Sequence, residues 1–458
     1  MFKTIFVEKN KVSIIISTIL LILISTIIFY KAINYKTVMV EDLLFSSQYY
    51  EQFQNEGIIK KIFTTSVYFD RVKYLYRPIF ILSFYIDSKI SLGKVNLKVN
   101  HATSLVLHLL CVLIFFYFLV NYCNFKLYLA LFGSLFFSIN IFSVWSAVWL
   151  SGRCDLLLFL FGFSSFIFFI KSNEENNIYK KTAFLFVHFI LFFLALLSKE
   201  TAVMLPVVCL IFAYIKGYKI KLISFFYIVV YALYSLMYSN DVNLVKQFLI
   251  LFDFKYVLYT ICDFLSAPFY LSKPKVISAY NYLTILEGVS IIILFIIAVI
   301  NSKEKKRISV YILFAALLFL PTLLGRRIAF QGNRMYFPMA YIIISLLYII
   351  DDFCKKDFNN IRTKIYTMLL MVFMIINLIY VNSAMEIAYN DDSAMNIIYD
   401  EYKANIKDRK ESLKVISFLI GQYKMYGYSE QAKNIRYKIF GFNFADKTRK
   451  KMKNSQKQ

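Results

Sequence analysis

Long apolar runs recur along the chain and are separated by short polar segments. An α-helix needs about 20 predominantly apolar residues to cross a bilayer. Runs close to that length lie at 12–30, 101–121, 127–143, 155–170, 182–197, 201–215, 222–238, 282–300, 308–324, 336–350 and 365–381. The pattern predicts an all-α polytopic membrane protein, a bundle of about 11 transmembrane helices.

A further apolar segment at 248–271 is interrupted by Asp253, Lys255 and Asp263. Counting it as a span would move the basic run at 303–307 to the outer side, against the preference of basic loops for the cytoplasm. We therefore expect an interfacial or re-entrant helix in this segment.

Lysine and arginine residues between the runs indicate the orientation. With a cytoplasmic N-terminus, the inner loops carry the basic residues at 126, 171–181, 216–221, 303–307 and 355–364. The first run follows three lysines and lacks a small-residue cleavage site, which indicates a retained signal anchor. We expect a multi-pass integral membrane protein with an extracytoplasmic C-terminus. The frequent Ile, Lys, Asn, Phe and Tyr are typical of an AT-rich genome and favour a bacterial cytoplasmic (inner) membrane over the endoplasmic reticulum.

Two segments lie outside the predicted bilayer, both on the outer side. Residues 31–100 form a long first outer loop with amphipathic helices, within a membrane domain of residues 1–381. Residues 382–458 form a short, polar, helical extracytoplasmic tail. No internal repeat of 20 to 50 residues is evident.

Composition excludes a water-soluble globular protein. The chain is 59% hydrophobic and 17% charged, whereas soluble domains carry about 25% charged residues. The net charge of +24 would suit a protein that binds nucleic acid, but basic loops beside anionic lipid headgroups account for it. We therefore expect membrane lipid as a partner, and no nucleic acid. The 6 cysteines are scattered without a CxxC pair, which favours buried core residues over metal ligands or disulfides.

Ionisable side chains at the outer ends of the runs are candidates for function, because a charge near hydrocarbon is costly and usually has a partner or a task. Glu41 and Asp42 follow the first run, and in a partly desolvated cleft such a pair can supply a general base. A solvated pair of loop acids is the plainer alternative. Arg77, in Tyr-Arg-Pro, offers a planar fork of donors suited to phosphate, or it snorkels at the interface.

Two other groups lie at the same level. His101 and His108 are seven residues apart and share one helix face, where they either pack in the core or shape a cleft. Arg153 and Asp155 occupy a tight outer turn, where they are expected to pair with each other or to bind a substrate.

The remaining candidates are mostly cations. Lys199 and Glu200 lie in a later outer hairpin. Arg326, Arg327 and Arg334 belong to an outer loop without a single acid. Positive charge is disfavoured on that side, so three arginines there indicate an anionic partner, and phosphate is the natural one.

The order of these motifs resembles the GT-C membrane glycosyltransferases, and most closely the transmembrane, TPR-bearing protein O-mannosyltransferase family. The matching pieces, between about residues 38 and 350, are Tyr-Arg-Pro at 76–78, the two histidines, the segments 149–155 and 196–206, and Arg-Met-Tyr-Phe-Pro at 334–338. The resemblance implies an 11-span layout with the N-terminus inside and the C-terminus outside. It also implies a polyprenyl-phosphate-linked sugar as donor on the outer or lumenal side.

The resemblance further implies roles for single residues. Asp42 matches the acid that members use as base after the first span, with Glu41 where they usually have a second Asp. Arg77 and the region of Arg334 and Tyr336 match segments that face the phosphate of the donor. The chain departs from the family at 140–148, where Asn-Ile-Phe-Ser-Val-Trp-Ser-Ala-Val replaces HPxHTEAV. Residue 104 is Ser instead of Asn, and the TPR array is absent, so neither mannose nor a protein acceptor is assigned.

Together these features predict an inverting glycosyltransferase that moves a sugar from a polyprenyl-phosphate carrier to a glycan, lipid or protein acceptor at the outer membrane face. Asp42, and next Glu41, is the expected base. No resident metal is predicted, and a divalent metal is compatible with the chemistry. Donor-phosphate binding is expected from Arg77, Arg326, Arg327, Arg334 and Tyr336, and the cleft is expected to be shaped by His101, His108, Arg153, Asp155, Lys199 and Glu200.

Three alternatives stay open. A transporter or flippase for a lipid-linked anionic substrate would place ionisable residues near the bilayer midplane and show an inverted repeat. The apolar runs are nearly free of charge, which favours chemistry at the outer surface. An O-antigen ligase or polymerase also uses polyprenyl-linked glycans, and a non-catalytic GT-C-like scaffold would explain the missing family residues.

Overall fold

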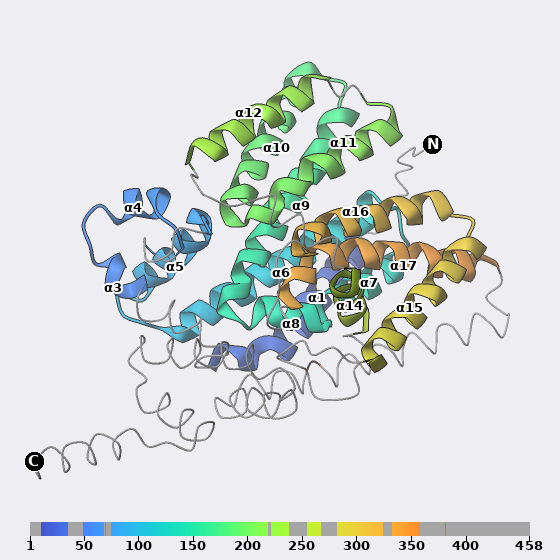
Figure 1. Cartoon of the computed structure of the whole chain (residues 1–458), viewed down its shortest axis with the longest axis horizontal. Helices are drawn as coiled ribbons and strands as arrows, with labels where there is room; N and C mark the ends of the chain where they lie inside the picture. The colour runs from blue at the N-terminus through green and yellow to red at the C-terminus, as the bar shows by residue number, and fades with distance from the viewer. Residues whose placement is uncertain are drawn as a thin grey trace, which may run out of the picture.

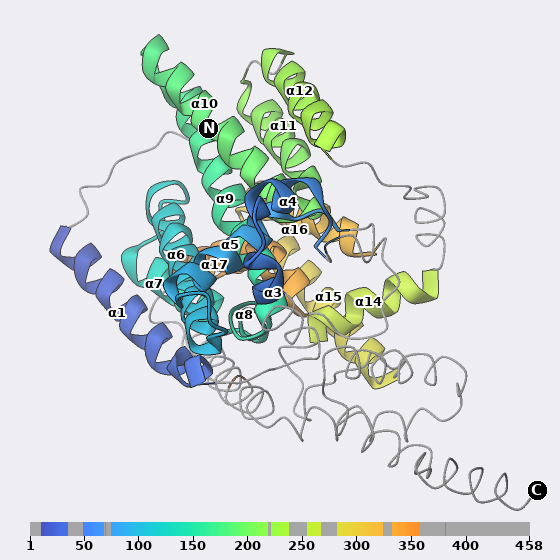
Figure 2. The same cartoon turned by 90° about the vertical axis from the view of Figure 1, so that its left-hand side faces the viewer.

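A computed structural model describes residues 11–34, 49–67, 69, 75–218, 221–237, 254–266, 282–323, 332–356 and 381. Every regular element in these ranges is a helix, and no strand occurs among them. The helices gather into one bundle from which α10, α11 and α12 project together (Figures 1 and 2). The predicted all-α class is therefore confirmed for the described part of the chain.

Six helical segments in the described part of the chain are long and apolar enough to cross a bilayer. The first is α1 (Lys11–Phe29) with the 3-10 turn η1 (Tyr30–Asn34). The others are α6 (Leu97–Asn121), η3 (Leu150–Gly152) with α9 (Arg153–Glu174), α10 (Ile178–Ser198), α16 (Lys305–Leu323), and η7 (Gly332–Met335) with α17 (Tyr336–Lys356). A seventh crossing results if α7 (Leu127–Ile139) and α8 (Ile141–Ala147), which meet at 58°, form one broken span. These segments define a multi-pass, membrane-embedded protein.

The predicted number of 11 spans is not confirmed, because six to seven segments among the described residues are long and apolar enough to cross a bilayer. Helix α11 (Leu205–Lys216), after η4 (Glu200–Met204), has 12 residues and is too short to cross alone. Helices α12 (Lys221–Met237) and α15 (Tyr282–Asn301) contribute only shorter apolar stretches. The predicted run at 365–381, apart from Val381, and the predicted tail at 382–458 lie outside the described residues.

The interrupted segment at 248–271 contains α14 (Phe254–Ser266), a 13-residue helix that is shorter than a crossing. It packs on α15. Gly288 allows the close approach, because a Cβ there would lie 2.5 Å from the Cα of Cys262. A short helix was the expectation for this segment, and its placement relative to the membrane stays a prediction.

The bend between α7 and α8 is made by one residue, Asn140. Its amide nitrogen donates to the carbonyl oxygens of Phe136 and Phe137 at 3.1 and 2.7 Å, which satisfies the open end of α7. Its amide oxygen accepts from the backbone nitrogens of Phe142 and Ser143 at 3.0 and 3.2 Å, which caps α8. A buried asparagine thus stops one helix, starts the next, and aims α8 across the end of the bundle.

The segment between α1 and α6, which was predicted as the first outer loop, carries three helices on one side of the bundle (Figure 1). They are α3 (Tyr49–Phe53), α4 (Ile58–Thr64) and α5 (Pro78–Ile90). They surround a small hydrophobic core of their own. This core reaches the bundle through Leu150, Cys154 and Leu157 at the start of α9. Helices α3, α4 and α5 are therefore packed onto the bundle at the end where α9 begins.

Helix direction decides which ends meet. Helices α9 and α10 run antiparallel, as do α16 and α17, so the starts of α9 and α17 lie at the same level as the ends of α10 and α16. At the opposite end, the carboxylate of Asp352 accepts from the backbone nitrogen of Lys303 at 2.8 Å and from the hydroxyl of Ser302 at 3.0 Å. Motif residues that are far apart in sequence are thereby collected at one end of the bundle.

Candidate functional site

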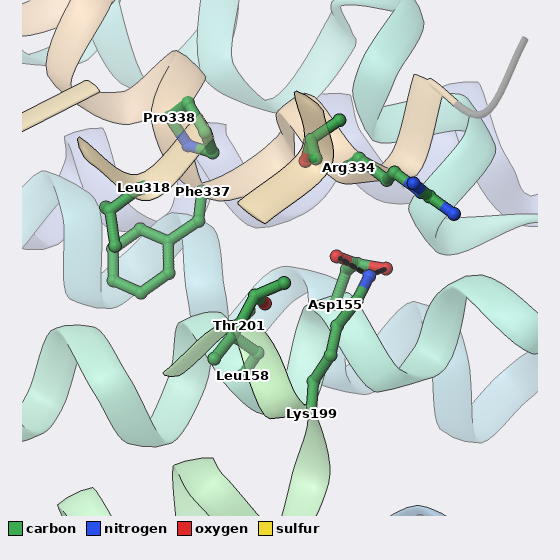
Figure 3. Close-up of a pocket in the computed structure, with 9 residues that line it drawn as sticks. Asp155, Leu158, Lys199, Thr201, Leu318, Arg334, Phe337 and Pro338 are labelled. Atoms are coloured by element: carbon green, nitrogen blue, oxygen red, sulfur yellow. Dashed lines mark hydrogen bonds and ion pairs between the residues drawn. The ribbon is translucent and has the colours of Figure 1, made fainter. Parts of the chain in front are cut away.

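A small pocket opens at this end of the bundle, between α9, α16 and α17 (Figure 3). Its polar wall combines one acid, two cations and two threonines with an apolar floor. The lining residues are Asp155, Leu158, Lys199, Thr201, Leu318, Thr322, Arg334, Phe337 and Pro338. Three of the sequence-predicted site residues, Asp155, Lys199 and Arg334, therefore lie on one pocket.

Asp155 is the centre of the polar wall. It lies in the first turn of α9, where a carboxylate suits the positive end of the helix dipole, and Lys199 follows the last residue of α10, where a cation suits the negative end. Lys199 Nζ donates to both carboxylate oxygens of Asp155 at 2.6 and 2.7 Å. Asn333, from η7, adds a hydrogen bond from Nδ2 to Oδ2 at 2.7 Å. All three side chains are buried, so the acid is held by partners from two other segments.

A second ion pair adjoins the first through the chain neighbours Lys199 and Glu200. Arg77, which precedes Pro78 at the first position of α5, donates Nε and Nη2 to the two carboxylate oxygens of Glu200 at 2.9 and 2.6 Å. Such two-point pairing is the strong form of an arginine–carboxylate contact. Desolvation opposes the charge of Glu200, but the Arg77 guanidinium overcomes it and lowers the pKa of Glu200 to about 2. The Glu200 side chain is 42% exposed, so this pair forms the open edge of the cluster.

Arg153 lies behind the pocket and takes no part in its surface. Its Nη1 donates to Asp87 Oδ2 at 2.8 Å, and Nη2 donates to the carbonyl oxygen of Asn100 at 2.5 Å. The guanidinium also stacks 3.9 Å from the ring centre of Phe84. The expected pairing between Arg153 and Asp155 is wrong, because each side chain reaches a partner on another element instead of its chain neighbour.

Sequence reasoning missed Asp87, although a signal was present. Asp87 falls on the same face of α5 as Phe80 and Phe84, at intervals of four and three residues. An acid in the apolar stripe of an amphipathic helix is a candidate for a buried partner, and the nearest deep cation is Arg153.

The histidines and Tyr336 belong to the interior of the bundle. His108 Nδ1 lies 2.8 Å from the hydroxyl of Tyr336, and His108 Nε2 lies 3.3 Å from the hydroxyl of Ser138. Both histidines and Tyr336 are at most 1% exposed. Tyr336 thus contacts His108, and it is not among the residues that line the cavity.

Several predicted residues lie outside the described part of the chain. Glu41, Asp42, Arg326 and Arg327 are among them. Within the described ranges, no group of three or more His, Cys, Asp and Glu side chains lies close enough together to hold a metal ion. The described pocket offers cations and hydrogen-bond donors around a paired acid, a set suited to an oxyanion.

The fold and the pocket define the class of protein: a multi-pass helical membrane protein with a charged pocket where α9 and α17 begin. No family model matches the chain, and no curated protein matches it.

Proposed function

We propose that the protein is an inverting glycosyltransferase that takes a sugar from a polyprenyl-phosphate carrier. The observation that carries the proposal is the convergence of motif residues from four distant segments. Arg77, Asp155, Lys199 and Glu200 form two adjoining ion pairs, and Arg334 lines the same pocket. These are the segments through which the sequence resembles the GT-C membrane glycosyltransferases.

The charge of the cluster suits a phosphodiester. Among these five side chains, three cations, Arg77, Lys199 and Arg334, outnumber two carboxylates, Asp155 and Glu200. A polyprenyl-phosphate sugar carries one negative charge at its phosphodiester. When the bond from the sugar to the phosphate breaks, the departing phosphate gains a second negative charge, and cations placed around it stabilise that change.

The proton leaves from the other side of the reaction. In the proposed mechanism, Asp42 takes the proton from the acceptor hydroxyl as its oxygen attacks the anomeric carbon, with Glu41 as the next candidate. The phosphate leaves from the opposite face, so the configuration at the sugar inverts. The acceptor is a glycan, a lipid or a protein hydroxyl.

The orientation is part of the proposal. We infer that the pocket faces the extracytoplasmic side of a bacterial inner membrane, with the N-terminus in the cytoplasm and the C-terminus outside. In support, exposed Lys180 and the cations Lys126 and Lys171 lie at the other ends of their helices. A cytoplasmic position for that end satisfies the positive-inside preference.

The test is sugar transfer by the purified full chain in lipid nanodiscs, with a panel of polyprenyl-phosphate sugars. We expect Asp42→Asn to lose transfer while donor binding persists. Arg334→Gln should weaken donor binding about 10-fold or more, because it removes a charge-assisted contact to phosphate. Lys180→Gln, which removes an exposed cation at the other end of α10, is the matched control and should change neither quantity.

Two results would contradict the proposal. One is an absence of transfer and of binding with every donor in the panel. The other is full activity in Asp42→Asn and in the corresponding Glu41→Gln variant, which would leave the proposed base without a role. A donor that binds without being transferred would favour a scaffold or a flippase instead.

A further inference from the structure

Three buried polar atoms without hydrogen-bond partners occur beside the pocket. They are the indole nitrogens of Trp145 and Trp149 and the amide oxygen of Asn333. The large majority of buried side-chain polar atoms in proteins have a hydrogen-bond partner, and each exception requires a reason. Two donors and one acceptor left open in one place point to a ligand with hydroxyl groups.

The three residues are brought together by the bend at Asn140. Helix α8, which carries Trp145, packs against η7, which carries Asn333. The rings of Trp145 and Trp149 meet edge to face, with centroids 6.2 Å apart and an interplanar angle of 85°. The segment is pressed firmly onto the start of α9, since a Cβ on Gly152 would lie 2.4 Å from the carbonyl oxygen of Trp145.

Asn333 links this place to the pocket. Its Nδ2 is committed to Asp155, which fixes the direction of the amide and leaves Oδ1 as the open acceptor. Both Asn333 and Trp149 are 5% exposed, and Trp145 is partly buried. The open atoms therefore belong to side chains that are fixed in position next to the charged cluster.

The chemistry of these groups selects among ligands. An ionised phosphodiester has no proton to donate to the amide oxygen, and a metal cation cannot accept hydrogen bonds from two indole N–H groups. A pyranose ring has hydroxyls that both donate and accept, and its apolar C–H faces suit aromatic rings. We propose that Trp145, Trp149 and Asn333 form a carbohydrate subsite beside the phosphate pocket, which takes a pyranose ring.

This inference rests on the proposed function, of which it names a ligand subsite, and the ring has two possible sources. It is either the sugar of the lipid-linked donor or a sugar unit of the acceptor. Trp145 and Trp149 are the only 2 tryptophans of the chain, so the whole tryptophan emission reports on this subsite. Binding is thereby measurable without any transfer.

The experiment titrates a panel of methyl glycosides and short oligosaccharides into the full chain in nanodiscs and records tryptophan emission. A second arm uses polyprenyl phosphate alone and polyprenyl-phosphate hexose. We expect a saturable change with at least one sugar. Trp145→Phe and Trp149→Phe keep a ring but remove the N–H donor, and each should weaken sugar binding about fivefold. If the lipid-linked hexose displaces the free glycoside, the ring is the sugar of the donor; if both bind together, it belongs to the acceptor.

Tyr341→Phe is the matched control, because it also removes a buried hydroxyl that lacks a hydrogen-bond partner, deeper in the bundle. It should leave sugar affinity unchanged. An emission unaffected by every sugar, while polyprenyl phosphate still binds, would overturn the subsite and leave the proposed function standing. Unchanged sugar affinity in both tryptophan variants would also overturn it. Sugar-dependent emission without transfer from any donor would support the subsite and refute the proposed function.

Discussion

The ion pair of Arg153 and Asp87 tests how α5, and with it α3 and α4, is attached to the bundle. Both side chains are 0% exposed. In Arg153→Met, Asp87 still accepts a hydrogen bond from the hydroxyl of Thr103, at 2.6 Å, but it loses its counterion. Breaking a buried pair by removing one partner costs about 3–5 kcal/mol, because a charge is left buried without compensation. We expect Arg153→Met to be destabilised by this amount.

Removing both charges should cost less. Burial raises the pKa of Asp87 above its ordinary value, since desolvation outweighs the attraction of Arg153 and the bond from Thr103. The ionised pair is therefore expensive to bury. In Arg153→Met with Asp87→Asn, the new amide oxygen still accepts from Thr103, and we expect a loss of about 1–2 kcal/mol. The double variant should thus be more stable than Arg153→Met alone.

The assay is unfolding of the purified protein in mixed micelles, followed by tryptophan emission. Trp149 is four residues from Arg153, so the emission reports on the region that changes. Lys180→Met, at an exposed cation, is the control and should stay within about 0.5 kcal/mol of the wild type. Wild-type stability in Arg153→Met would refute the role assigned to this pair. A stability loss in the double variant that equals the sum of the losses in Arg153→Met alone and Asp87→Asn alone would also refute it.

Three further predictions concern the same region. Gly152→Ala should destabilise the fold by about 1–3 kcal/mol in the same unfolding assay, because its Cβ would collide with the backbone of Trp145; an unchanged midpoint would contradict the close contact. Tyr341→Phe should be neutral or stabilise by up to about 1 kcal/mol, since it removes an unsatisfied buried hydroxyl, and a loss above 1 kcal/mol would indicate a missed partner. For Glu200, whose pKa is lowered to about 2 by Arg77, the stabilisation should be full above about pH 4.5 and vanish as the pH falls through 2. Solvent screening limits it to about 1 kcal/mol at this exposed carboxylate, and the measured quantity is the difference between wild type and Glu200→Gln across pH, which should shrink on acidification.

Hydropathy predicted the helices well, because a segment that crosses a bilayer needs predominantly apolar residues along its whole length. The long runs at α1, α6, α9, α10, α16 and α17 all appear as helices. The run at 201–215 was predicted less well at its start, because its first residues form the 3-10 turn η4 and α11 begins only at Leu205. The break at Asn140 was also missed. An asparagine inside an apolar run can lie on a continuous helix or cap two helices, and only its packing decides which.

For the site, the sequence indicated at which end of the bundle a charged residue lies, but not which residue it pairs with. Charge near hydrocarbon indicated correctly that Asp155 and Lys199 lie at one end of the bundle, but not that they pair across 44 residues. Local spacing favoured the Arg153–Asp155 pair, whereas the long arginine side chain reaches Asp87 on α5. Tyr336 was expected to bind the phosphate of the donor, whereas its hydroxyl forms a hydrogen bond with His108. The choice among partners depends on interhelical distances, which no single sequence contains.

The buried cations at the pocket end and two lysines at the opposite end are held in different ways, and this bears on the proposed function of the pocket. At the pocket end, Arg77, Arg153 and Lys199 are each paired with an acid from another element. At the opposite end, Lys126 lies 6.0 Å from the ring centre of Tyr128, and Lys171 lies within 5.4 to 6.0 Å of three rings. Cations beside anionic headgroups need only an aromatic surface for their stems, whereas buried cations need carboxylates. Under the proposed function, an anionic ligand would therefore meet Lys199 in the pocket and Arg77 beside it already oriented by acids, and would bind without first ordering these two cations.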